Sequence, residues 1–308
     1  MSATNDATAW PNIEVSGWAP TKRSLHLCSQ MLGKLRVALS PPQPNWMHTA
    51  LALDARGFTT GAMPCRETSA EGLIDVFSSE LILRHSTGDE RRIALVPART
   101  VAEIYAAVQE AVVALGIDCA ISPIPQEVPD TTPMSDDTHP AVYDPAAVQR
   151  WFRAATATAG VFDRWRSRFF GRSGIALWWG AFDLAVIVFN GRHVPAPTDR
   201  GYLFKYDLDA ELMNCGLYFG DEKTSPFFYG YIYPQPAAIE DVAMPAGVTW
   251  SATLKEWVLP YELVRTADAP GAMISAFLDA LYDLCVTRAE WDRAALSYRA
   301  PRSAAAAD

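Results

Sequence analysis

The stretch that most constrains the fold spans residues 175–197, which read IALWWGAFDLAVIVFNGRHVPAP and form the most apolar part of the sequence. Side chains of an extended strand alternate between its two faces. Both faces of this stretch are apolar, so the pattern predicts a central strand that is covered on both sides. One acid, Asp183, lies in its middle. Its carboxylate is therefore expected to be buried among apolar groups.

Burial of an unpaired charge is costly, so Asp183 requires either a partner or a raised pKa. Two interpretations meet this requirement. In the first, Asp183 is a structural carboxylate that is held by an arginine or by backbone N–H groups. In the second, it is a general acid or base, or the anchor of a ligand, and has a shifted pKa.

The length and charge of the chain limit what it can bind. Its 308 residues are enough for one large domain or two ordinary ones, and half of them are hydrophobic, so a packed core is expected. The formal net charge is -9. Because binding to phosphate groups requires a basic surface, we predict no nucleic-acid partner.

The cysteines and the apolar runs indicate the compartment. The chain has five cysteines and no C-x-x-C motif, which is typical of free thiols in a reducing cytosol. The first residues lack the basic and apolar regions of a signal peptide. The longest apolar run, residues 175–189, is shorter than the ~20 residues that a membrane helix requires. We predict a soluble cytoplasmic protein without a membrane partner.

Hydrophobic periodicity predicts four helices, with strands between them, over residues 22–39, 101–115, 145–170 and 270–286. Thr100 and Glu103 have the spacing of a capping box before the second helix. Asp144 and Pro145 fit the N-cap and first position of the third helix. Proline and acidic residues dominate 123–144, as in a linker. The predicted organisation is a flexible lead-in (1–20), a first half (21–122), this linker (123–144), a second half (145–298) and a tail (299–308).

The two halves share an order of elements. Each begins with a helix, continues with a tryptophan-bearing strand and further strands, and closes with a helix. This repeated order predicts an internal duplication of an α-β-β-β-α unit. The fold class expected from these elements is α+β, with mostly antiparallel sheet covered by helices. A cleft between the halves is the expected place for a site.

Several polar and aromatic side chains are candidates for that cleft. The expected ligand-binding residues are His26, Gln30, His48, Trp179, Tyr229 and Tyr231, and the expected catalytic carboxylates are Asp183 and Glu211. A carboxylate that works as a general base near neutrality needs a pKa raised by burial. The alternative for His26 and Gln30 is a solvated or interface stripe on the first helix. The alternative for the tyrosines is a sheet-packing face.

The chain carries few signals for a metal or a cofactor. Asp136, Asp137 and His139 have side chains that bind metals, but acidic linkers commonly hold such residues without one, so we predict no metal site. The motifs of P-loop proteins, dinucleotide-binding folds, zinc proteases and α/β-hydrolases are absent from the sequence. The sequence leaves the cofactor and the oligomeric state unknown.

Two functions from different classes agree with these features. In the first, the protein binds a small molecule in the cleft, either as a binding protein alone or as an enzyme that acts on it with a carboxylate acid or base. In the second, it is a non-catalytic interaction or scaffold protein, in which the tryptophans and tyrosines are core or interface residues. The first requires that several of the polar candidates converge on one concave surface.

Four segments resemble a bacterial domain-of-unknown-function family. They are the pattern T-x-x-x-L-H-L at 21–27, FDLAV-x-x-F-x-G-R at 182–192, Y-x-Y-x-Y-P-x-P at 229–236 and LPYE at 259–262. The resemblance covers about residues 10–296 and implies a fold but no assigned reaction. It also implies a His-Glu pair where this chain has Ala210 and Glu211. A group that the histidine supplies in relatives is therefore missing at this position.

Overall fold

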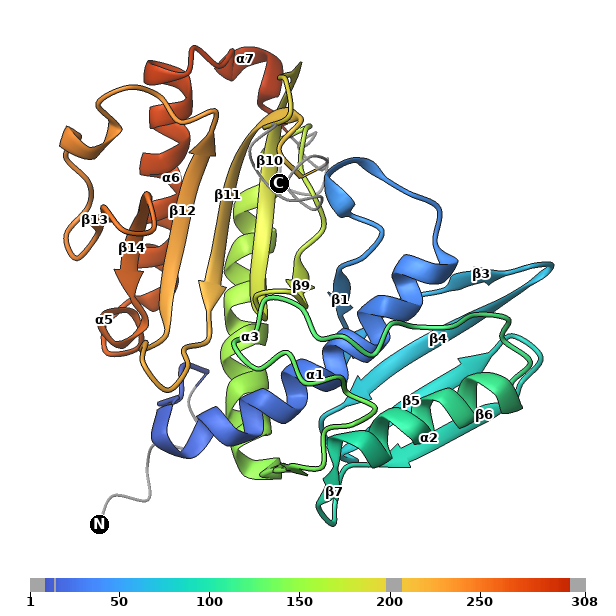
Figure 1. Ribbon diagram of the computed structural model, residues 1–308. Helices are drawn as coiled ribbons and strands as arrows, with labels where there is room; N and C mark the ends of the chain where they lie inside the picture. Colours follow the sequence, from blue (N-terminus) through green and yellow to red (C-terminus); the bar gives the residue numbers. More distant parts are fainter. Residues whose placement is uncertain (1–8, 14, 198–206, 300–308) are drawn as a thin grey trace, which may run out of the picture.

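The computed structural model describes residues 9–13, 15–197 and 207–299 (Figure 1). Most strands join one antiparallel sheet of 12 strands with the order β13-β14-β12-β11-β10-β9-β1-β2-β4-β5-β6, in which β3 also pairs with β4. The strands of the sheet are β1 (Leu51–Leu53), β2 (Gly57–Thr59), β3 (Met63–Cys65), β4 (Thr68–Asp75), β5 (Glu80–His85), β6 (Glu90–Ala94), β9 (Ala176–Trp178), β10 (Asp183–His193), β11 (Ala210–Tyr218), β12 (Phe227–Tyr233), β13 (Thr249–Ser251) and β14 (Glu256–Pro260). A second, two-stranded sheet pairs β7 (Arg99–Thr100) with β8 (Pro140–Ala141).

The described helices are α1 (Val15–Leu39), α2 (Val101–Ala114), α3 (Pro145–Arg166), α5 (Tyr261–Arg265), α6 (Pro270–Arg288) and α7 (Arg293–Leu296), with short 3-10 turns at Pro44–Trp46 and Ile239–Asp241. The predicted α+β class and antiparallel sheet are thus confirmed. The capping box of Thr100 and Glu103 is present at the start of α2. The Asp144 side chain caps α3 as predicted. No described helix is long and apolar enough to cross a membrane.

The structure does not show the predicted duplication. The two halves meet where β1 pairs with β9, so they contribute to one sheet rather than to two related units. The first half supplies mostly short strands, whereas the second supplies the long strands β10 and β11. The repeated order of helices and strands therefore reflects how helices cover any antiparallel sheet. Residues 1–8 of the predicted lead-in and 300–308 of the predicted tail lie outside the described residues.

The apolar stretch 175–197 forms two strands and not one. Strand β9 ends at Trp178, and β10 begins at Asp183 and pairs back with it. Phe182 has a φ of 57° in the turn between them. A central position is confirmed, since β10 pairs with β9 and β11. The reversal escaped the sequence analysis because the turn residues are as apolar as the strands, so hydrophobicity alone does not mark it.

The core lies between the sheet and its helices. Trp151 of α3 is fully buried, and its ring stacks on Trp18 of α1 at 5.7 Å and on Phe182 at 5.3 Å between centroids. Behind the sheet in Figure 1, α3 and α6 cover β10, β11 and β12. None of the described helices covers the face of these strands that is turned toward the viewer, and we call it the helix-free face. Asp183, Gly216 and Tyr229 belong to that helix-free face by their register.

Helix α1 joins the two halves through a buried polar stripe. Lys22, His26, Gln30 and Lys34 follow one another at intervals of four residues, and all four are buried. They bond to backbone atoms of other segments: Lys22 Nζ to Gly220 O, His26 Nε2 to Trp179 O and Gly180 O, Gln30 to Gln126 and Lys34 Nζ to Ile124 O. The stripe is thus an interface stripe between α1 and three chain segments, at residues 124–126, 179–180 and 220.

The predicted linker 123–144 is packed on the molecule. It has little regular structure, as its prolines predict, and runs across α1 (Figure 1). Met134 is fully buried within it. Gln30 both donates to Gln126 O at 2.7 Å and accepts from Gln126 N at 2.8 Å. These contacts make the segment a strap that is fixed to α1 rather than a free connection.

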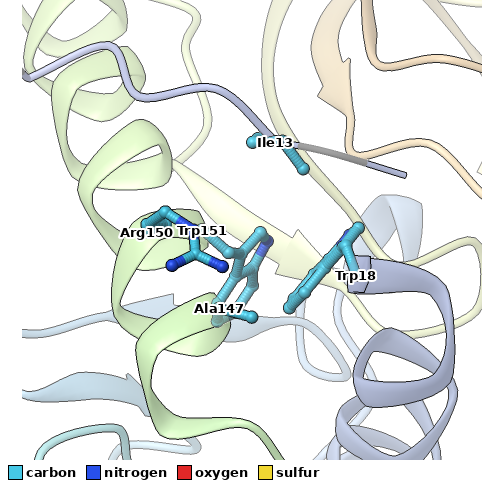
Figure 2. A pocket seen from close by; sticks show the side chains of 5 residues that line it. All are labelled: Ile13, Trp18, Ala147, Arg150 and Trp151. Carbon is cyan, nitrogen blue, oxygen red and sulfur yellow. The ribbon is translucent and has the colours of Figure 1, made fainter. Parts of the chain in front are cut away.

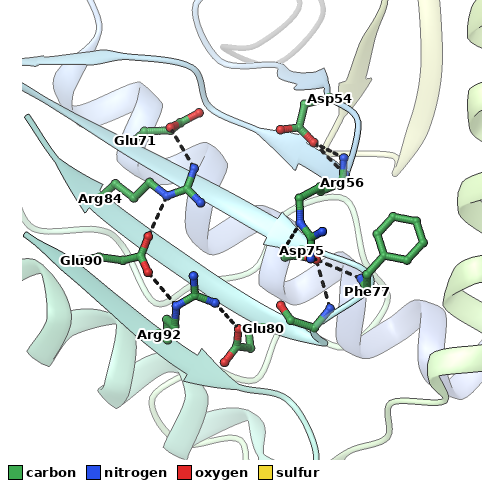
Figure 3. A network of polar contacts seen from close by, with 11 residues as sticks. Asp54, Arg56, Glu71, Asp75, Phe77, Glu80, Arg84, Glu90 and Arg92 are labelled. Carbon is green, nitrogen blue, oxygen red and sulfur yellow. Dashed lines mark hydrogen bonds and ion pairs between the residues drawn. The ribbon is translucent and has the colours of Figure 1, made fainter. Parts of the chain in front are cut away.

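Charged side chains form a ladder on the strands of the first half, as Figure 3 shows. Acids and arginines alternate across β4, β5 and β6, with Arg84 between Glu71 and Glu90, and Arg92 between Glu90 and Glu80. These side chains are mostly half exposed, so each pair contributes little stability. Their charges make β6, which ends the sheet, a poor template for pairing with another strand.

Gly33 allows α1 to pack closely on Trp179. A Cβ at Gly33 would lie 2.2 Å from Trp179 Nε1, which donates to Thr49 O at 2.8 Å. Gly33→Ala is therefore expected to shift the indole and to lower the free energy of unfolding by about 1–3 kcal/mol, measured by chemical denaturation. Gly17→Ala is the matched control on the same helix, because no atom lies within 4 Å of its Cβ position. Equal stability of the two variants would refute this packing.

Candidate functional site

Asp183 is the most deeply buried acid on the helix-free face. Its side chain is 5 % exposed, and it accepts a hydrogen bond from Tyr229 Oη of β12. Strand β11 lies between the two residues, and its Gly216 pairs with Tyr229 on one side and Ala185 on the other. A Cβ at Gly216 would lie 2.4 Å from Tyr229 Oη. The absence of a side chain at Gly216 thus lets the tyrosine ring cross β11 and reach Asp183.

Three further acids interact electrostatically with Asp183 or with one another. Glu127 comes from the strap, Asp207 from the segment before β11 and Glu256 from the start of β14. Gly180 leaves room for Glu127, since a Cβ there would lie 2.3 Å from Glu127 Oε1. Burial raises the pKa of each acid, that of Asp207 to about 6 and that of Glu256 to about 7. No cation or donor in the described part of the chain lowers any of these three pKa values.

Among the described cations, Lys22 of α1 acts electrostatically on Asp183. Its Nζ donates to Gly220 O at 2.6 Å and to Tyr218 Oη at 3.2 Å, and lies 4.3 Å from the centre of the Tyr218 ring. Tyr218 in turn donates to Asp221 at 2.5 Å. Burial lowers the pKa of Lys22 to about 8, although the charges of Asp221 and Asp183 oppose this shift. The ammonium therefore remains charged at neutral pH and offsets part of the acidic field.

The pKa of Asp183 is raised to about 7, mainly because burial disfavours the charged carboxylate. The negative charge of Glu127 acts in the same direction. The hydrogen bond from Tyr229 and the charge of Lys22 favour the carboxylate and limit the rise. An acid with a pKa near neutrality can gain or lose a proton under physiological conditions. Asp183 is thus neither a fully ionised ion-pair partner nor a permanently neutral core residue.

An apolar wall continues the site along the same face. It is a small cluster separate from the main core, formed by Ile187, Leu208, Leu212, Trp178, Phe189, Tyr231 and Tyr233. Tyr231 Oη accepts a hydrogen bond from Asn214 Nδ2 at 3.0 Å. Asn214 Oδ1 is buried and has no hydrogen-bond partner among the described residues. The face therefore offers carboxylates, an amide oxygen and aromatic rings side by side.

Three of the predicted ligand-binding residues support the turn and the strap. His26 Nε2 donates to Trp179 O and Gly180 O, each at 2.8 Å, and burial together with the charge of Lys22 lowers its pKa to about 4. Gln30 uses both its amide nitrogen and oxygen on Gln126. The Trp179 indole packs on Gly33. These side chains position the segments that carry Glu127 and Asp183.

Two predicted residues have partners in other places. His48 Nδ1 accepts from Gln43 N at 3.1 Å, and its ring stacks on Trp46 at 5.4 Å. Glu211 accepts from Asn190 Nδ2 at 2.5 Å and pairs with Arg192 at 3.2 Å. Glu211 follows the alternation of β11 away from the face of Gly216 and Asn214. Of the predicted site residues, the structure brings together Asp183, Tyr229 and Tyr231, and their roles remain predictions.

A second group of potential metal ligands lies in the strap. The ligand atoms of Asp130, Asp137 and His139 fall within 4.8 Å of one another, whereas the sequence analysis had considered Asp136 in place of Asp130. Arg23 Nη2 already bonds Asp130 at 2.9 Å and Asp137 at 2.8 Å. The guanidinium thus occupies the position that a cation would need, and the group functions as an ion-pair network.

A small hollow lies on the other side of the sheet, between α1 and α3. Figure 2 shows the five residues that line it: Ile13, Trp18, Ala147, Arg150 and Trp151. Its cavity volume is about 10 Å³, the space of about one water molecule. It is too small for an organic ligand, so the helix-free face remains the candidate site.

Comparison with known proteins assigns the chain to a family. A profile of the family of unknown function DUF5996 matches residues 10–298. The chain belongs to DUF5996. The resemblance drawn from its sequence segments is therefore confirmed. Neither a curated protein nor a solved structure matches the chain, so the site of this DUF5996 protein rests on its own geometry.

The predicted site residues did not include Lys22, Glu127, Asp207 and Glu256. For Lys22 a signal was present, because it lies four residues before His26 and eight before Gln30 on the same helix face. Glu127 lies in the proline-rich strap and Glu256 at the beginning of a strand. Nothing in the local pattern of either residue separates it from an ordinary surface acid.

The bond between Tyr229 and Asp183 depends on Gly216. Gly216→Ala is expected to push the tyrosine hydroxyl away, so that the pKa of Asp183 rises above its value of about 7. Tyr229→Phe removes the same donor without a clash and should raise this pKa as well. Carboxyl ¹³C NMR titration measures the effect. An unchanged pKa in both variants would contradict the assigned hydrogen bond.

The raised pKa of Asp183 also sets a pH dependence of stability. Its pKa is about 7 in the folded protein and 3.8 in the unfolded chain, so the folded state binds the proton between these values. The free energy of unfolding should therefore fall by about 4 kcal/mol as the pH rises from 4 to 8 through this group alone. Asp183→Asn is expected to flatten that dependence and to leave stability at pH 8 unchanged or higher, as measured by urea unfolding. A loss of 3–5 kcal/mol, typical of a broken buried ion pair, would instead make Asp183 a structural partner.

Proposed function

We propose that this DUF5996 protein binds a small cationic molecule on the helix-free face of β10, β11 and β12, with Asp183 as the anchor. The observation that carries the proposal is the buried Asp183 carboxyl, whose hydrogen-bond partner is Tyr229 and which faces Glu127 and Glu256. A bound cation stabilises the carboxylate form of acids that raise one another's pKa. An amine or guanidinium supplies both the positive charge and the hydrogen-bond donors.

The aromatic side chains support a ligand of this charge. A cation is attracted to the face of an aromatic ring within about 6 Å. Tyr229 and Tyr231 come from neighbouring positions of β12 on the same face, and Trp178 and Phe189 extend the wall. Carboxylates beside aromatic rings suit an organic cation with an apolar body better than a bare metal ion. The proposal includes a cytoplasmic location, because the five cysteines are free thiols.

Proton transfer by Asp183 is the second candidate function. The observation that favours it is a pKa of about 7 in a group that also faces the proposed ligand position. A base of this pKa can take a proton from an ammonium ligand or from a carbon beside it. Conversion of a bound compound by the native protein and not by Asp183→Asn, followed by mass spectrometry of the compound, would identify the protein as an enzyme.

A ligand panel tests the binding proposal. The panel compares organic cations with neutral alcohols and carboxylic acids of matched size at pH 8. The cations are primary amines, diamines, guanidinium compounds and quaternary ammonium compounds. A fitting cation at 100 times its Kd should add about 2.7 kcal/mol to the free energy of unfolding, while the neutral and anionic compounds should add none. Thermal unfolding identifies which class of compound binds, and calorimetry measures the affinity of that compound.

Variants and a pH series distinguish binding at this site from nonspecific attraction of cations to an acidic protein. Asp183→Asn should weaken the binding at least tenfold. Asp118→Asn, which removes an exposed acid with 81 % side-chain exposure, is the matched control and should bind normally. Affinity should also fall from pH 8 to pH 5, because protonation neutralises acids with pKa values of about 6 to 7. If no cation binds, or if both variants bind equally, the interaction or scaffold function becomes the better hypothesis.

A further inference from the structure

The cysteines are arranged in a way that the site does not use. Cys65 ends β3 and Cys119 follows α2, and both are half-buried at the edge of the main core. Cys215 of β11 and Cys285 of α6 are close enough to interact electrostatically, but they are 1 % and 0 % exposed. Cys28 is 2 % exposed on α1. Cys65 and Cys119 are thus the pair that solvent reaches.

Independent contacts bring Cys65 and Cys119 together although 53 residues lie between them. Arg66 follows Cys65, Asp118 precedes Cys119, and Arg66 Nη2 bonds Asp118 Oδ2 at 2.9 Å. Figure 1 shows the segment after α2 beside the β3–β4 hairpin. Burial raises the pKa of Cys119, and the charge of Cys65 raises it further. The two thiols are therefore close enough to interact electrostatically, and an ion pair joins the residues beside them.

We propose that Cys65 and Cys119 form a reversible intramolecular disulfide through exchange with a small-molecule disulfide such as oxidised glutathione. One thiolate attacks a glutathione sulfur, the glutathione S–S bond breaks, and one glutathione thiolate leaves. The second cysteine thiolate then attacks the mixed disulfide and releases the other glutathione. Two protein thiols are oxidised, one glutathione disulfide is reduced to two thiols, and the two protons pass to the released glutathione.

Access decides which cysteines react. Thiol–disulfide exchange requires a thiolate that the oxidant can reach. Burial raises the pKa of Cys28 to about 12 and that of Cys215 and Cys285 well above the ordinary range. Burial also raises the pKa values of Cys65 and Cys119, but these two side chains are only partly buried, so the oxidant can reach them. The buried cysteines Cys215 and Cys285 thus serve as an internal control for Cys65 and Cys119.

The cross-link acts on the segment that carries Glu127. Cys119 lies just before the strap and eight residues before Glu127, and Lys34 and Gln30 bind residues between them. A disulfide at Cys119 ties the beginning of the strap to the β3–β4 hairpin. This inference stands on the thiol positions alone and does not depend on the proposed cationic ligand.

The test is oxidation of the full native chain with oxidised glutathione at pH 8.5. Free thiols are then alkylated, the chain is digested without reductant, and the peptides are identified by mass spectrometry. We expect one cross-link, Cys65 to Cys119, that dithiothreitol reverses, while Cys28, Cys215 and Cys285 stay reduced. Any of three results would overturn the proposal. These are glutathione adducts on both Cys65 and Cys119 without a cross-link, no oxidation of either cysteine, or a cross-link of another pair.

Single variants give a second readout. Cys119→Ser should trap Cys65 as a stable glutathione adduct, and Cys65→Ser should trap Cys119 in the same way. Cys28→Ser is the matched control and should form the cross-link as the native chain does. Circular dichroism checks the fold of each variant, and the map of the native chain decides the proposal if a variant does not fold. Loss of the cross-link in Cys28→Ser alone would also contradict the assigned pair.

Discussion

The buried polar stripe of α1 is the interaction on which the rest of the structure depends. A turn and a proline-rich strap pass over this helix, and their backbone groups cannot all bond within regular structure. Buried N–H and C=O groups need partners, since an unpaired one costs about as much as a lost hydrogen bond. His26 supplies them to residues 179 and 180, and Gln30 and Lys34 supply them to residues 124 and 126. The same helix face thus fixes segments from both halves.

The acidic face follows from that arrangement. His26 holds the turn that leads into Asp183, and Gln30 holds the residue before Glu127. Two glycines then remove the obstacles, because Gly180 leaves space for Glu127 and Gly216 leaves space for Tyr229. The position of the acids is therefore fixed by neutral side chains and by missing side chains. No ion pair between described residues holds them, and the charge of Lys22 only offsets part of their field.

The sequence predicted the parts of this fold that local chemistry determines. The α+β class, the caps at Thr100 and Asp144, and the burial of Asp183 all follow from spacing and residue type. The turn after Trp178 did not, because apolar residues on both sides of it hide the reversal. The reach of Tyr229 across β11 depends on which strand lies between β10 and β12. That neighbour is decided by pairing over long sequence distances, and no local pattern contains it.

Burial of these acids destabilises the folded state, and the fold alone does not explain why they are present. Apolar residues of similar size would fill the face without a desolvation penalty, and replacement of buried charges by such residues is often neutral or stabilising. The Asp130 and Asp137 pair shows the structural solution in the same chain, since Arg23 bonds both. Glu127 and Glu256 have no such partner among the described residues, and each raises the pKa of another acid or has its own raised by one. Perturbed groups of this kind cluster at functional sites. Arg23 neutralises Asp130 and Asp137, whereas Glu127 and Glu256 have no ion-pair partner among the described residues. This contrast is therefore the strongest physical argument for a ligand that brings its own positive charge.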